Sequence, residues 1–204
     1  MEKLISFHGK QEIKDKYIQR LKNHMLADEI IQGIGFDKLS NKGCAIGCTL
    51  DKYDHFAFET ELGIPAILAV LEDNIFEGLS LEDSKEFPLN VLYAIPIGID
   101  LEIVYAKIFH WQLTNEKWGI IKDLTNEKDI EYFTKLADLY KNLIYGNISF
   151  NEFRNTNLAH LAYRAYLADR AYRAYRAYLT DLAYRPDYYK DLAEYFIQTL
   201  KQTI

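Results

Sequence analysis

The sequence predicts an all-α protein: a helical bundle with one long Ala/Tyr/Arg-rich helix near the C-terminus. Apolar residues recur with the 3.6-residue period of a helix over most of the 204 positions. No segment of useful length alternates between polar and apolar residues, as a half-buried strand does. The chain has only four prolines and ten glycines, so long helices are rarely interrupted. A chain of this length can bury a proper core.

The first predicted element is an amphipathic helix from Gly9 to Gln32, which Gly33 ends. Its apolar residues recur at helical spacing: Ile13, Tyr17, Ile18, Leu21, Met25, Leu26 and Ile30. The glycine-dense segment 33–48, GIGFDKLSNKGCAIGC, is typical of a long polar loop. We expect a short strand or a turn at residues 44–50.

Three helix-boundary signals follow this loop. Asp54 is predicted to cap a short helix that Gly63 stops, and Pro65 is predicted to begin the next helix. That helix, PAILAVLEDNIFEGL, is apolar on nearly every face, so we expect it in the core. Ser80 and Asp83 have the spacing of a weak capping box.

The next two segments are also predicted to be helical. Residues 87–99, FPLNVLYAIPIGI, hold two prolines and a glycine, which predicts a short helix and a tight turn. Asp100 then caps a largely buried helix at 101–113, LEIVYAKIFHWQL. His110 and Trp111 lie in this apolar helix and are expected in the core.

The last part of the chain contains the clearest helix signals. Thr125 precedes an amphipathic helix that Gly146 ends. Ser149 and Glu152, three residues apart, form a capping box that begins the next helix. From there nothing interrupts a helix until Pro186, and a last helix, DYYKDLAEYFIQTLKQ, follows.

The predicted helix Phe150–Arg185 contains a triplet repeat at 162–185, AYRAYLADRAYRAYRAYLTDLAYR. A 3₁₀-helix has this period, but 3₁₀-helices of such length are rare. Collagen needs glycine at every third position, and the repeat has none. The repeat therefore predicts an α-helix. A bundle-type 3-4 seam overlies the triplet: Leu158, Leu161, Ala165, Ala168, Tyr172, Tyr175, Leu179 and Leu182. We expect this seam to pack on the helix at 127–145 and on the C-terminal helix. Leu161→Asp should then cost several kcal/mol, and Arg173→Ala under about 1 kcal/mol.

Two regions are expected within one compact unit: a helical N-terminal region with the glycine-rich loop at 1–124, and a long-helix region at 125–204. No stretch approaches the roughly 20 apolar residues that span a bilayer. The first ten residues lack the apolar run of a signal peptide, and two cysteines make no disulfide framework. We therefore expect a cytoplasmic protein with no membrane contact.

The charge distribution argues against general DNA binding, because the net charge is −6. Residues 159–185 form one basic island with five Arg and two Asp, which leaves −9 for the rest. In one interpretation, the Arg and Tyr side chains of this island bind a nucleotide or RNA. In the other, the Tyr side chains pack in the bundle and the Arg side chains extend to water. The predicted partner-binding residues lie here: Arg164, Arg170, Arg173, Arg176, Tyr163 and Tyr166.

The two cysteines offer an alternative site. Cys44 and Cys48 have a spacing allowed for half of a zinc site, which His24 and His55 would complete. The same residues allow a cysteine nucleophile with a histidine base. Small buried thiols packed against a helix are the third interpretation. No nucleotide-binding, metalloprotease or serine-hydrolase motif is present, so we assign no catalytic residue and no cofactor besides this zinc alternative.

Several motifs together resemble a known group of proteins. The segment FHGKQEIKDKYIQRLKNHMLADEIIQG, then KGCAIGCTL, ELGIP and LEDNIFEGL, and finally a long Ala-rich tract, are similar to an uncharacterised family encoded by bacteriophages and prophages. The resemblance runs from about Ser6 to the C-terminus. The family has no assigned activity and supplies no site residues, and its tract is richer in Ala and Asp. The resemblance implies a phage setting, hence the cytoplasm of a host cell.

Two hypotheses on function follow. The resemblance implies a counter-defence protein, similar to anti-CRISPR proteins, that binds and modulates a host defence effector such as an RNA-guided nuclease or its RNA complex. The acidic surface outside the tract suits a basic, nucleic-acid-handling partner. The alternative is a small enzyme or a metal- or ligand-binding protein that uses Cys44, Cys48, His24 and His55.

Overall fold

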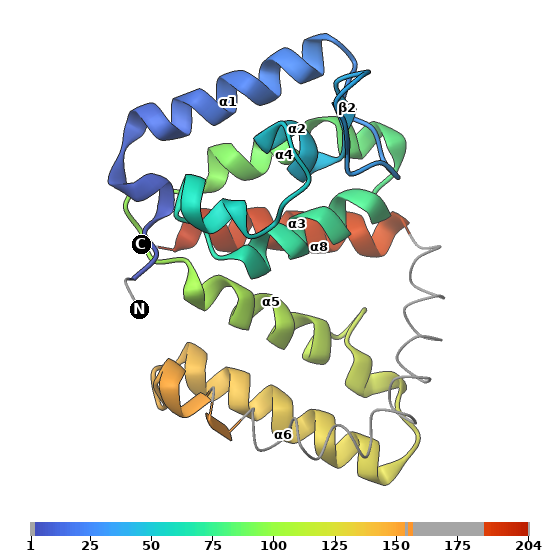
Figure 1. Cartoon of the computed structure of the whole chain (residues 1–204). Helices are drawn as coiled ribbons and strands as arrows, with labels where there is room; N and C mark the ends of the chain where they lie inside the picture. Colours follow the sequence, from blue (N-terminus) through green and yellow to red (C-terminus); the bar gives the residue numbers. More distant parts are fainter. Residues whose placement is uncertain (1–2, 154, 157–185, 204) are drawn as a thin grey trace. The chain divides into compact units, whose positions relative to one another are not determined.

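The computed structural model describes residues 3–153, 155–156 and 186–203, and its fold is mostly α-helical, as predicted (Figure 1). The chain forms two compact units: Met1–Val104 with Pro186–Ile204, and Tyr105–Arg185. The C-terminal helix thus belongs with the first unit, whereas the expected division at residue 124 groups it with the second. Within the described ranges, no helix combines the length and apolar character needed to cross a membrane.

The elements of the first unit are mostly helices around one core. They are η1 Ser6–Gly9, α1 Gln11–Leu26, β1 Phe36–Asp37, β2 Lys42–Gly43, α2 Ala45–Leu50, η2 Phe58–Leu62, α3 Ala66–Gly78, α4 Leu81–Ala94 and α8 Pro186–Gln202. Strands β1 and β2 pair antiparallel, Phe36 opposite Gly43. Helix α5, Glu102–Thr114, spans the division between units, and the second unit adds η3, Ile120–Asp123, and α6, Glu127–Ile144.

Helix α1 ends at Leu26, so the prediction of a helix to Gln32 is wrong. Asp28 takes the left-handed conformation, φ 54°, which stops the helix six residues before the expected last residue, Gln32. The chain then runs beside β2, where the Gly43 amide donates to the Glu29 carbonyl at 3.0 Å. Ile30 is buried by its contact with the hairpin and not by a helix. For this reason the apolar pattern of the sequence continues beyond the end of α1.

Residues 45–50 form a helix rather than the expected strand or turn. All six residues of α2 are buried, so the segment shows no amphipathic period. Gly47 lies against the Gly35 carbonyl, where a Cβ would collide with the backbone. The glycines of this segment therefore serve close packing rather than a flexible loop.

Helix α4 begins as predicted but is longer than expected. The Asp83 amide donates to the Ser80 hydroxyl at 3.0 Å, which confirms the cap. The helix then continues through Pro88 to Ala94, so the short helix expected within 87–99 is part of a 14-residue helix. Pro88 removes one helical hydrogen bond, and its ring is buried in the packing of the unit. The expected tight turn follows, with Gly98 at φ 77°.

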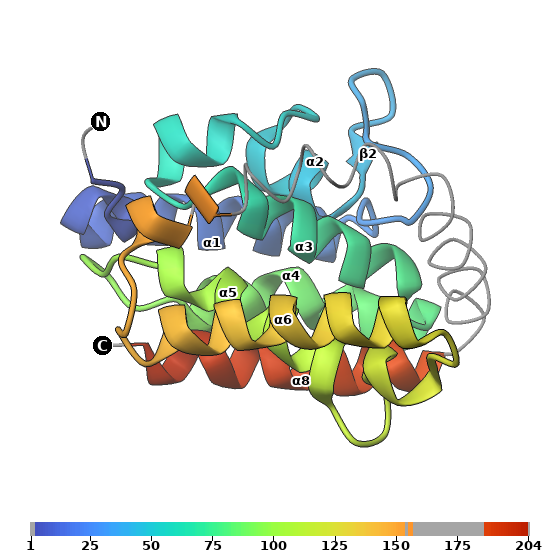
Figure 2. The same cartoon turned by 90° about the horizontal axis from the view of Figure 1, so that it is seen from below.

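The C-terminal helix α8 completes the first core. It packs against α3 and α4. Figures 1 and 2 show its course from two sides. Its buried face includes Tyr188, Leu192, Ala193, Phe196 and Leu200. The Tyr189 ring covers Gly78 at the end of α3 so closely that any larger residue at 78 would collide with it.

The second unit is built on aromatic contacts between its helices. Tyr140 stacks on Phe109 with ring centroids 5.8 Å apart and contacts Phe153 at 5.1 Å. The capping box of Ser149 and Glu152 is confirmed, because each backbone amide donates to the other residue's side chain.

Other sequence-based expectations for the second unit differ from the structure or lie outside it. His110 and Trp111, expected in the core, are only partly buried. Residues 150–153 are helical, but most of the predicted helix to Arg185, its seam and Leu161 lie outside the described residues.

Candidate functional site

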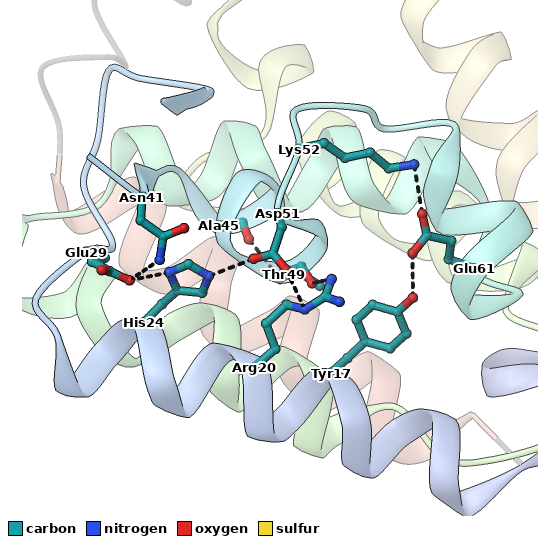
Figure 3. A network of polar contacts seen from close by, with 10 residues as sticks. All are labelled: Tyr17, Arg20, His24, Glu29, Asn41, Ala45, Thr49, Asp51, Lys52 and Glu61. Carbon is teal, nitrogen blue, oxygen red and sulfur yellow. Dashed lines mark hydrogen bonds and ion pairs between the residues drawn. The ribbon is translucent and has the colours of Figure 1, made fainter. Parts of the chain in front are cut away.

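One polar cluster of the first unit lies along α1 and faces the hairpin and the end of α2 (Figure 3). A pocket of about 700 Å³ opens over it. Its lining has eight charged or hydrogen-bonding residues: Lys16, Gln19, Arg20, Asn23, His24, Glu29, Asn41 and Asp51.

His24 is the centre of this cluster and is only 4% exposed. Its Nδ1 lies 2.6 Å from Glu29 Oε2, and its Nε2 lies 2.9 Å from Asp51 Oδ1. Each ring nitrogen thus lies within hydrogen-bond distance of a carboxylate oxygen. Asn41 donates to the same Glu29 oxygen at 2.8 Å, and Arg20 pairs with Asp51 at 3.0 Å. The members of the cluster thus bind one another and hold α1 to the two segments that follow it.

The same face of α1 continues into a second hydrogen-bonded group. The Tyr17 hydroxyl donates to Glu61 at 2.6 Å, and Lys52 reaches the other Glu61 oxygen at 2.8 Å (Figure 3). Burial and the bond to Glu61 raise the pKa of Tyr17, so this phenol stays protonated at neutral pH. Burial opposes ionisation of Glu61, but hydrogen bonds from Lys52 and Tyr17 outweigh it and lower the pKa of that carboxyl. This arrangement therefore holds α1 to the residues that follow α2. It does not supply a general acid and base for catalysis.

We expect His24→Leu to lower the free energy of unfolding by about 2–3 kcal/mol, since it removes a buried side chain whose ring contacts both Glu29 and Asp51. Urea unfolding followed by circular dichroism measures the change. Lys85→Ala is the control, because the Lys85–Asp28 pair is solvent-exposed and should contribute under about 1 kcal/mol. Equal losses in the two variants would contradict a central role for His24.

A second polar cluster lies where α3 meets the start of α2. Cys44 Sγ and one carboxylate oxygen each of Asp73 and Glu77 lie within 4.8 Å of one another. The other groups around Asp73 are the Tyr53 hydroxyl, 2.9 Å from its Oδ2, and His55 Nε2, 3.1 Å from the same oxygen. Thiol, carboxylate and imidazole groups are all ligands of transition metals.

Both cysteines are buried, as one interpretation of their spacing predicts. Burial raises the pKa of the Cys48 thiol to about 12, and its Sγ donates to the Gly43 carbonyl at 3.3 Å. Burial and the neighbouring Asp73 carboxylate raise the pKa of Cys44 as well. Two protonated, covered thiols lack the thiolate that nucleophilic attack needs.

The structure places the four residues of the predicted zinc alternative in two clusters. Cys44 and His55 both adjoin Asp73, whereas His24 is held by its two carboxylates and Cys48 by backbone carbonyls. The six predicted partner-binding residues of the tract, Arg164, Arg170, Arg173, Arg176, Tyr163 and Tyr166, lie outside the described residues.

Sequence analysis did not assign Asp51, Asp73 or Glu77 to a site. Asp73 and Glu77 carried a usable signal, because two acids four residues apart share one face of an otherwise apolar helix. Asp51 carried none, since its place beside His24 depends on the left-handed conformation it takes after α2, φ 56°.

Comparisons with protein-family models, curated proteins and solved structures gave no match to this chain.

Proposed function

We propose that this protein acts by binding another protein, as a counter-defence factor that modulates a nucleic-acid-handling effector of the host. A set of exposed apolar side chains at one end of the first unit is the main support. Leu26 is 88% exposed, Ile34 45%, Leu39 98% and Leu81 74%. We call these four residues the hairpin-end surface. Apolar side chains of this size, ringed by polar groups, are typical of a protein-binding surface.

Hydrogen bonds bring the segments that hold these residues together. The Gln32 side chain donates to the Phe76 and Leu79 carbonyls at the end of α3, at 2.6 and 3.0 Å. Lys85, in the first turns of α4, reaches Asp28 at 3.2 Å. The hairpin lies beside the C-terminal end of α1 (Figure 1). The loop after α1, the hairpin and the α3–α4 connection therefore share one end of the unit.

Charge indicates the kind of partner. Residues 26–43 and 77–86 contain seven acidic and three basic side chains, and the chain outside 159–185 carries −9. Acidic segments that also carry exposed apolar side chains suit a basic protein surface, and the opposite charge accelerates association with it. Nucleic-acid-handling proteins offer such surfaces, and the resemblance to phage proteins favours a host defence nuclease among them.

Leu39→Asp tests this proposal. The wild-type protein should bind and inhibit a purified RNA-guided nuclease from a set of such enzymes. Its expression in a host that carries that nuclease should restore phage plating. Leu39→Asp should weaken inhibition about 10-fold or more, because hot-spot residues contribute at least about 2 kcal/mol to binding.

The matched control is Tyr145→Asp, which places the same charge at a 71% exposed side chain of the second unit. This variant should inhibit like the wild type, and both variants should keep the wild-type melting temperature. The proposal fails if the wild-type protein inhibits no nuclease of the set, or if Leu39→Asp inhibits as well as Tyr145→Asp does.

A further inference from the structure

Asp73 presents a buried carboxylate oxygen that lacks a partner in the described part of the chain. The residue is 9% exposed. Its Oδ2 takes hydrogen bonds from Tyr53 and His55, while Oδ1 is buried and accepts none from the described residues. A buried carboxylate oxygen without a hydrogen bond is costly, which makes it the kind of atom that a cation stabilises.

Further carboxyl groups lie near Asp73, and His55 is the one basic side chain of the described residues that reaches it. Glu77 lies one turn further along α3, and like charges at this spacing repel. Glu72, beside Asp73 in the sequence, is 2% exposed and has a buried Oε1 that also lacks a partner in the described ranges. No Lys or Arg of the described ranges forms an ion pair with any of the three. Burial, followed by the Asp73 charge, raises the pKa of Glu72 well above its usual range.

The geometry points to a zinc-type metal site whose ligands are Cys44 Sγ, an Asp73 carboxylate oxygen and a Glu77 carboxylate oxygen. The three ligand atoms lie within 4.8 Å of one another. A sulfur ligand selects zinc or another borderline transition metal over magnesium and calcium, which prefer oxygen alone. This inference is independent of the proposed protein-binding function.

Neighbouring hydrogen bonds orient the two carboxylates for this task. Tyr53 and His55 hold Asp73 through Oδ2, so they act as positioning residues rather than as ligands. The Gly33 amide donates to Glu77 Oε2 at 2.9 Å, which leaves the other Glu77 oxygen for the metal. Glu77 is exposed, so a metal reaches the site from solvent. Three protein ligands leave a tetrahedral metal one position for water or a ligand.

The two cysteines make a matched test, because both are buried free thiols four residues apart. The full-length protein, stripped with a chelator, is titrated with Co²⁺ and then with Zn²⁺. We expect one Co²⁺ per chain, a near-ultraviolet thiolate–cobalt band that Zn²⁺ abolishes, and a higher melting temperature with either metal. Cys44→Ser should lose the band and bind at least about 10-fold more weakly, whereas Cys48→Ser should keep both properties.

Glu77→Gln provides a second variant, because its exposed side chain can change without disturbing the core. It should also bind about 10-fold more weakly, while Glu82→Gln, an exposed acid of α4, should bind like the wild type. Circular dichroism of the metal-free variants checks that each is folded. The assignment is overturned if the wild type binds no metal, if the band survives Cys44→Ser, or if Cys48→Ser removes it.

Discussion

Gly47→Ala should destabilise the protein by at least about 3 kcal/mol, as severe overpacking does. A Cβ at this position would fall on the Gly35 carbonyl oxygen and lie 2.9 Å from the Gly35 carbonyl carbon. Both clashing atoms are backbone, so neither moves aside by a change of rotamer. On helix propensity alone, alanine would stabilise α2 by up to about 1 kcal/mol relative to glycine. A loss of stability therefore reports the close approach of α2 to the segment before the hairpin.

Gly33→Ala is the control for this prediction. Its φ is 82°, but nothing lies within 4 Å of the position that a Cβ would take. Conformational strain alone should cost about 1–2 kcal/mol. Urea unfolding of both variants separates strain from collision. A Gly47→Ala protein as stable as the wild type would disprove the packing of α2 described here.

The packing at Gly47 also shows what sequence reasoning can and cannot reach. Local signals predicted the helix starts at Ser80 and Ser149, because a cap depends on residues three positions apart. They failed at residues 45–50, because a helix buried on every side has no polar face to reveal its period. They also extended α1 too far, because the burial of Ile30 comes from contact with the hairpin.

The candidate sites follow the same rule. His24, Cys44 and His55 stood out by residue type alone. Their partners depend on tertiary contacts: Asp51 meets His24 across 27 positions, and Asp73 meets His55 across 18. The expected function in phage counter-defence stays a prediction, which the nuclease assay tests.

Phe196→Ala should lower the free energy of unfolding by about 3–5 kcal/mol, as the loss of a large buried aromatic side chain does. Phe196 is 1% exposed and lies on the face of α8 that packs into the first unit. Helices α3 and α4, which α8 contacts, precede it by about a hundred residues of sequence. The first unit therefore cannot complete its core until the C-terminal helix has joined it.

Glu194→Ala is the control, because this side chain is exposed on the same helix and contributes little to packing. Its unfolding midpoint in urea should stay near that of the wild type, while that of Phe196→Ala falls. The structure also predicts that residues 1–104 alone unfold without a cooperative transition, since they lack the helix that covers α3 and α4. A cooperative transition of that fragment, or a Phe196→Ala protein as stable as Glu194→Ala, would show that α8 is not part of the first core.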